Sequence, residues 1–233
     1  MATQVAATSS RFRAARRLQQ SLTAGLEKQV LVWIALRIPA FINSDHLTTL
    51  GFVAQLLTGV SYAMSRSDRI WLIGGIGFLA LNWLGDSLDG TLARVRNQQR
   101  PRYGFYVDHI LDSIGAVALL GGMALSRYMS PVVACGLLVL FLLLSIQSYL
   151  ATYTLDEFRM SFWSFGPTEL RLLLICGNLA LFRWSWVLHH HYRLFDIGGA
   201  IGIAGMAAML IAFTTRNIVR LYREEPIRET RSN

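Results

Sequence analysis

Long apolar segments dominate the pattern along this chain, and most charged residues lie between them. A helix needs about 20 mostly apolar residues to cross a bilayer. Six segments approach or exceed that length, at residues 47–65, 70–93, 104–125, 131–151, 169–188 and 197–215. The pattern predicts an all-α integral membrane protein with six transmembrane helices.

The residues before the first apolar segment follow a different pattern. Residues 12–38 mix Arg and Lys with Leu, Val, Ile and Trp33, which is typical of an amphipathic helix lying in the membrane interface. Asn43, Ser44 and Asp45 then offer N-caps for the first transmembrane helix. We therefore predict three parts: a basic arm with an interfacial helix (1–46), a six-helix transmembrane domain (47–216), to which any chemistry of the chain would belong, and a basic cytoplasmic tail (217–233).

The first 25 residues carry four arginines, and no acid precedes Glu27. Such a segment resembles either a cleaved transit peptide or a basic arm on an anionic leaflet. The arm is the favoured interpretation because the basic character continues into Lys28 and Arg37.

Composition and charge support the membrane assignment. The chain is 53% hydrophobic, has a mean hydropathy of +0.40 and is only 15% charged, against about 25% charged residues in soluble domains. The net charge is +8, but the basic residues lie between apolar segments, which disfavours nucleic-acid binding. With the N-terminus inside, 17 of the 22 Lys and Arg residues fall on the inner side. This bias predicts both termini on the cytoplasmic face of an inner or cytoplasmic membrane, in preference to the mitochondrial inner membrane.

Four aspartates stand near the inner ends of two predicted helices. Asp86 and Asp89 are three residues apart, and Asp108 and Asp112 are four apart, so each pair shares one helix face. Insertion scales place the cost of a mid-membrane Asp at about 2.5–3.5 kcal/mol, so four of them near one interface need a reason. A hairpin of about ten residues brings both pairs to one depth. All-oxygen clusters of this kind suit Mg²⁺ or Mn²⁺.

Small and basic residues follow the first pair. Gly90 and Ala93 leave room for a ligand to approach, and Arg94 ends the helix with a side chain that binds phosphate bidentately. These residues indicate a metal-bound phosphorylated substrate at a membrane surface.

The stretch DSLDGTLAR, a spacer of nine residues and then GFYVDHILD resembles the signature of the CDP-alcohol phosphatidyltransferases. Every fixed position is filled, by Asp86, Asp89, Gly90, Ala93, Arg94, Gly104, Asp108 and Asp112. The spacer is one residue longer than is usual in the family and lies in the loop between the helices. The predicted helices extend the resemblance over nearly the whole chain.

The resemblance implies transfer of a substituted phosphate from a CDP-linked donor to an alcohol, with release of CMP in phospholipid biosynthesis. It implies two divalent ions held by Asp86, Asp89, Asp108 and Asp112, with Asp112 also the general base. It further implies a homodimer and a nucleotide site whose residues are Asp89, Gly90, Ala93, Arg94 and Gly104.

Other polar residues on the inner side are weaker candidates. Glu169 and Arg171 open the fifth predicted helix and are candidates for binding the acceptor or a phosphate; snorkelling is an equally good interpretation of Arg171. His109 follows Asp108 and is a candidate for orienting a carboxylate. Two further groups have open roles: a polar end of the fourth helix (Gln147, Ser148, Tyr149 and Tyr153) and a histidine run in an outer loop (His189, His190 and His191).

Several alternatives stay open from the sequence. The donor is CDP-diacylglycerol with a polar acceptor, or CDP-choline or CDP-ethanolamine with diacylglycerol, so one substrate is a lipid in either case. A membrane prenyltransferase also holds Mg²⁺ and diphosphate with helical aspartates, and Asn82 gives a faint match to such a motif. A cation transporter would use carboxylates as a relay, but its acids would be spread across the membrane.

Overall fold

The computed structural model describes residues 24–155, 167–183 and 193–225. These residues are helical or lie in short connections, and they contain no strand. The seven helices are α1 (Ala24–Ala35), α2 (Ser44–Met64), α3 (Ile70–Val95), α4 (Pro101–Leu125), α5 (Pro131–Leu155), α6 (Pro167–Arg183) and α7 (Leu194–Glu224). The all-α class predicted from the sequence is confirmed.

Five of these helices, α2, α3, α4, α5 and α7, are long and apolar enough to cross a membrane. The chain is therefore described as a multi-pass membrane protein. The remaining predicted span begins as α6, which has 17 residues up to Arg183. Its predicted end falls within 184–192, outside the described residues, so the count of six spans stays a prediction.

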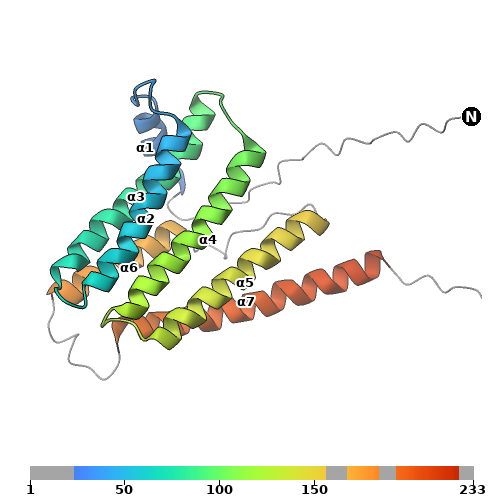
Figure 1. Ribbon diagram of the computed structural model, residues 1–233. Helices are drawn as coiled ribbons and strands as arrows, with labels where there is room; N and C mark the ends of the chain where they lie inside the picture. The colour runs from blue at the N-terminus through green and yellow to red at the C-terminus, as the bar shows by residue number, and fades with distance from the viewer. Residues whose placement is uncertain (1–23, 156–166, 184–192, 226–233) are drawn as a thin grey trace, which may run out of the picture.

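The helices form two neighbouring groups. Helices α2, α3 and α4 lie side by side, and α6 packs against α3 (Figure 1). Helices α5 and α7 run together as a pair, and α5 contacts α4 (Figure 1). Short α1 packs Leu31 and Ala35 into a core with residues of α2 and α3. The interfacial position of this helix stays a prediction, since residues 12–23 of the predicted helix lie outside the described part.

Local sequence signals explain where the helices begin. Asn43 caps α2: its side chain accepts from the His46 N–H at 3.0 Å, and the His46 ring accepts from the Asn43 N–H at 3.2 Å. This reciprocal pair is a capping box with histidine in place of the usual acid. Helices α4, α5 and α6 begin at Pro101, Pro131 and Pro167, because proline lacks the N–H that the first turn leaves unbonded anyway.

The end of α3 fixes where the aspartate-bearing hairpin turns. Asn97 has a φ of 55°, and the Gln98 N–H bonds back to the Ala93 carbonyl at 2.9 Å. A left-handed residue after the last helical turn, with this bond, is the usual way a helix stops. Asparagine tolerates that backbone conformation better than most residues.

Two glycine contacts hold α2 against both aspartate-bearing helices. A Cβ at Gly85 of α3 would lie 2.7 Å from the Gly51 Cα of α2. A Cβ at Gly122 of α4 would lie 2.6 Å from the Gly59 carbonyl carbon. Real Cβ atoms do not approach backbone this closely, so these helices touch backbone to backbone at both points.

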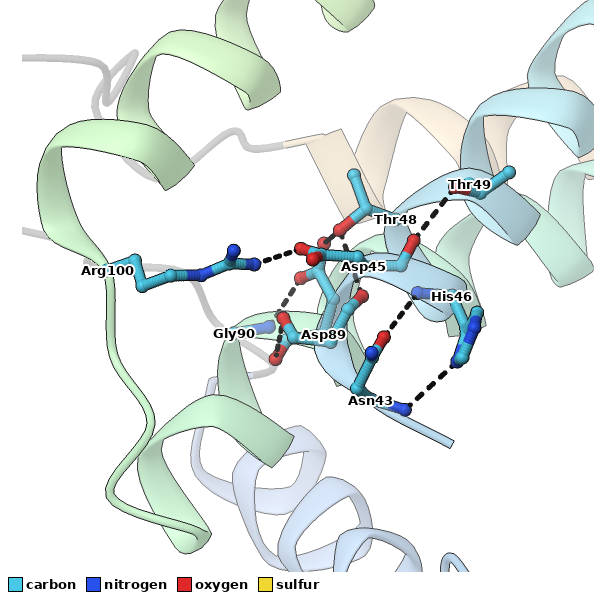
Figure 2. Close-up of polar contacts among 9 residues, drawn as sticks. Asn43, Asp45, His46, Thr48, Thr49, Asp89, Gly90 and Arg100 are labelled. Atoms are coloured by element: carbon cyan, nitrogen blue, oxygen red, sulfur yellow. Dashed lines mark hydrogen bonds and ion pairs between the residues drawn. The ribbon is translucent and has the colours of Figure 1, made fainter. Parts of the chain in front are cut away.

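Two arginines of the α3–α4 connection bind the chain that precedes and begins α2. Arg96 donates to the carbonyls of Ile38 and Pro39 at 2.9 and 3.0 Å, and also to the Ile42 carbonyl. Arg100 forms an ion pair with Asp45 in the first turn of α2 (Figure 2). These contacts fix the start of α2 beside the hairpin.

The Gly51–Gly85 contact generates a prediction with a control on the same helix. Gly85→Ala forces apart two backbones and is expected to lower the free energy of unfolding by about 1–3 kcal/mol. Gly77→Ala meets no atom within 4 Å and is expected to be neutral or stabilising by up to about 1 kcal/mol. Thermal unfolding in detergent measures both. Equal midpoints for the two variants would contradict the close packing.

Candidate functional site

All four aspartates of the hairpin line one recess. Asp86 and Asp89 reach it from α3, and Asp108 and Asp112 from α4. The recess is open to solvent, and the space between its walls is about 410 Å³. Its other lining residues come from α2, α3, α4 and α6: Thr48, Gly51, Phe52, Gln55, Asn82, Leu111 and Arg171. The sequence-based prediction that the two pairs meet is confirmed.

Asp89 is the buried member of the four, with 8% of its surface exposed. Its Oδ2 accepts from the Thr48 hydroxyl at 2.6 Å. The same hydroxyl lies farther, at 3.1 Å, from its other acceptor, the Ser44 carbonyl. Its Oδ1 accepts from the Gly90 N–H (Figure 2). The Ser44 hydroxyl bonds the Asp89 carbonyl at 2.9 Å. The N-terminal turn of α2 therefore holds this carboxylate in place.

Asp86 has a different partner, on a different helix. Arg171 of α6 donates to Asp86 Oδ2 at 2.8 Å. The Arg171 side chain is only 15% exposed, whereas that of Asp86 is 43% exposed. Arg171 therefore lines the recess and pairs with Asp86 there, as a candidate for phosphate binding would. It supplies one positive charge to a group of four carboxylates.

The chemistry of this group fits a hard divalent ion, which prefers oxygen ligands. The polar residues that line the recess are Asp, Asn, Gln, Thr and Arg, and the four acids are the most numerous. Within the described residues, however, no three His, Cys, Asp or Glu side chains converge closely enough to hold a metal. Two of the carboxylates have protein partners instead: Asp86 pairs with Arg171, and Asp89 accepts from Thr48 and Gly90. Because a carboxylate has about four lone-pair sites, Asp89 could bind an ion without losing these partners. Metal binding would require other carboxylates of the group to turn toward the ion.

Asn82 was not predicted as a site residue, yet it lines the recess. Its Nδ2 donates to the Gly51 carbonyl at 3.0 Å. Its Oδ1 is buried and has no hydrogen-bond donor among the described residues. The spacing contains a signal for this residue: it lies four positions before Asp86 and seven before Asp89, on the same face of α3.

The other signature positions lie beyond the recess lining. Arg94 donates to the Thr91 hydroxyl at 3.0 Å, and its guanidinium lies 3.4 Å from the place a Gly90 Cβ would take. A Cβ at Gly104 would meet nothing within 4 Å, so space is open there. Ala93 is partly buried in the last turns of α3. The nucleotide-binding role of these residues stays a prediction.

The remaining polar candidates do not line the recess. The His109 ring packs on Tyr149 at 5.1 Å between centroids and does not line the recess. Gln147 and Ser148 line a second recess between α5 and α7, with Arg216 and Asn217. Tyr153 is 88% exposed, and Glu169 is partly buried in the first turn of α6. His189, His190 and His191 lie outside the described residues.

With this geometry established, comparison with known proteins identifies the family. A family model described as CDP-alcohol phosphatidyltransferase matches residues 41–216, which is most of the chain. The chain belongs to the CDP-alcohol phosphatidyltransferase family. A search of curated proteins finds no match. Membership in this transferase family removes the basis for the prenyltransferase and transporter alternatives.

The bond between Thr48 and Asp89 generates a second prediction. Thr48→Val keeps the shape of the side chain but removes a donor from a buried carboxylate, which is expected to cost about 1–3 kcal/mol of stability. The matched control is Thr49→Val, because the Thr49 hydroxyl only bonds the Asp45 carbonyl of its own helix at 2.8 Å (Figure 2). This control is expected to stay within about 0.5 kcal/mol of the wild type. Thermal unfolding at neutral pH in detergent compares the two; a control as destabilised as Thr48→Val would contradict this role of Thr48.

Proposed function

We propose that this protein transfers a substituted phosphate from a CDP-linked donor to an alcohol acceptor and releases CMP. The observation that carries the proposal is the recess lined by all four signature aspartates, in a chain of the CDP-alcohol phosphatidyltransferase family. Acids within the apolar helices of a membrane protein are costly and are usually functional.

In this proposal Asp86, Asp89 and Asp108 hold divalent ions, Mg²⁺ or Mn²⁺, together with Asp112. When bound, such ions would neutralise the diphosphate of the donor and the charge that develops on the departing CMP. Asp89 suits a fixed ligand role because Thr48 and the Gly90 N–H hold its two oxygens. Asp86 is the more exposed of this α3 pair.

Asp112 is the proposed general base. It lines the recess one turn of α4 beyond Asp108 and is exposed, so an acceptor hydroxyl can reach it. Its carboxylate takes the hydroxyl proton as the acceptor oxygen bonds to the phosphorus of the donor. The bond from that phosphorus to the CMP oxygen breaks, and CMP leaves with the electron pair.

The donor is proposed to be CDP-diacylglycerol with a polar acceptor, or CDP-choline or CDP-ethanolamine with diacylglycerol. The recess is proposed to open on the cytoplasmic side, supported by the four arginines between residues 94 and 102 of the hairpin. The homodimer implied by the family resemblance stays a prediction.

The experiment that tests the function is CMP release by the detergent-purified protein. Each of the three donors is offered against a panel of alcohols, with Mg²⁺, Mn²⁺ or EDTA. Metal-dependent CMP release is expected with one class of donor, and Asp112→Asn is expected to lower the rate by about 10²–10⁴-fold, as loss of a general base does. Asp68→Asn is the control, because Asp68 accepts from the Ile70 N–H at 2.9 Å at the start of α3 and lies outside the recess.

An Asp68→Asn variant with full activity beside an inactive Asp112→Asn variant would support the assignment. Equal activity of wild type and Asp112→Asn would contradict the base role. Absence of CMP with every donor, from folded protein saturated with metal, would contradict the proposed reaction.

Arg171 generates a separate prediction about substrate binding. We propose that Arg171, with Glu169 beside it, binds a phosphate of donor or acceptor, since its guanidinium already lies in the recess. Removing a charged hydrogen bond is expected to raise the KM of the phosphate-bearing substrate in Arg171→Gln about tenfold or more. Arg171→Lys keeps the charge and is expected to recover part of this loss.

The control for Arg171 is Arg220→Gln. Arg220 also pairs with an acid, Glu224 at 2.8 Å, but on the exposed surface of α7. The Arg220→Gln variant is expected to leave the KM of the phosphate-bearing substrate unchanged. A KM in Arg171→Gln equal to that of the control would contradict the phosphate-binding role.

A further inference from the structure

The amide oxygen of Asn82 is the most unusual polar atom of the recess. Asn82 is 6% exposed, and no described residue donates a hydrogen bond to its Oδ1. Buried polar groups in folded proteins are almost always paired, and an unpaired one is costly. This acceptor therefore points to a partner that is not part of the protein.

The direction of the Asn82 amide is set by its neighbour. The Gly51 carbonyl can only accept, so the group 3.0 Å from it must be the Asn82 NH₂. The oxygen is consequently the amide atom that is left without a partner. The close contact of Gly51 with Gly85 leaves little freedom for α2 and α3 to shift and rotate this amide.

Asn82 lies in the same recess as the four aspartates. Asn82, Asp86 and Asp89 follow one face of α3 at spacings of four and three residues. All three line the recess, with Asp108 and Asp112 opposite on α4. Asn82 is the member farthest from the end of α3, so it lies at the deep side of the group.

Two donors on the recess wall already have other acceptors. Arg171 donates to Asp86, and the Thr48 hydroxyl to Asp89. A third, Gln55, has its stem packed where a Cβ of Gly115 would lie, 2.7 Å from that position. None of these three residues donates to Asn82 Oδ1.

We propose that Asn82 Oδ1 is a fifth protein oxygen of the divalent-metal site, bound to the ion or to a water on it. The inference rests on the metal-dependent function proposed above and goes beyond the four signature carboxylates. Amide oxygens are ordinary ligands of hard cations. A cation at this depth supplies what the buried oxygen lacks, and the bond to Gly51 holds the ligand in position.

Mn²⁺ binding tests the proposal without relying on activity. Purified protein is titrated with Mn²⁺ without nucleotide, and free Mn²⁺ is followed by electron paramagnetic resonance. Asn82→Ala is expected to weaken Mn²⁺ binding by about tenfold, the low end of the effect of removing a supporting ligand. Asn82→Asp is expected to bind Mn²⁺ more tightly than wild type while its metal-free form melts at a lower temperature, because it adds a fifth carboxylate.

The matched control is Asn178→Ala. Asn178 is also buried, with 0% exposure, but it lies on α6 and accepts from the Tyr62 hydroxyl at 3.0 Å, outside the recess. This variant is expected to melt earlier and to bind Mn²⁺ as wild type does. It separates loss of a buried asparagine from loss of a metal ligand.

The outcomes distinguish this inference from the proposed function. Weaker binding in Asn82→Ala with an unchanged Asn178→Ala supports the ligand. Wild-type Mn²⁺ affinity in Asn82→Ala, together with loss of binding in Asp89→Asn, overturns the ligand role of Asn82. The metal site then stands without Asn82, whose amide serves only to bond Gly51. Absence of Mn²⁺ binding in folded wild-type protein overturns both.

Discussion

Backbone contact between α2 and its two neighbours is the constraint on which the rest of the site depends. At Gly51–Gly85 and at Gly59–Gly122 the helices approach closer than any side chain permits. Helix α2 carries no signature aspartate, but it lies against both helices that do. Its first turns can therefore place Thr48 on Asp89, accept the Asn82 amide at Gly51 and hold Gln55 against Gly115. The recess is formed by α2, by α6 through Arg171 and by the two aspartate-bearing helices, rather than by the aspartate hairpin alone.

Charge is the second determinant. Four carboxylates share a small volume, and the described protein offsets them unequally. Asp89 is buried and accepts hydrogen bonds at both oxygens. Asp86 instead pairs with the long side chain of Arg171, which comes from α6. One carboxylate is thus held by α2 and by the backbone, and another is paired with a side chain of α6. Within the described residues, no three of these acids converge on one point.

The sequence predicted the main architecture because its signals are local. Apolar length located the helices, and Asn43 was among the three N-cap candidates and is the cap. The spacing of the aspartates predicted their meeting in one recess, which required only two helices and a short turn. Helix ends were less predictable. Helix α7 continues to Glu224, nine residues past the predicted span, because arginines end the apolar segment but are compatible with a continuing helix.

The contacts that sequence reasoning missed connect residues far apart in the chain. Nothing near Thr48 indicates a bond to Asp89, 41 residues later, and nothing near Arg96 indicates the carbonyls before α2. Arg171 was predicted to lie on the inner side, but its pairing with Asp86 depends on how α6 packs on α3. Such contacts follow from helix packing, which no local pattern contains.

The position of Arg171 also has a consequence for how the protein is made. Arg171 follows Asp86 by 85 residues, and a chain emerges from the ribosome N-terminus first. Helices α2, α3 and α4, with all four aspartates, are therefore synthesised before the arginine that pairs with Asp86 exists. Until α6 arrives, the nascent protein holds a set of acids without this internal cation. The acidic group gains this counter-charge only late in biogenesis, so a chain truncated before α6 would enter quality control with Asp86 lacking its arginine partner.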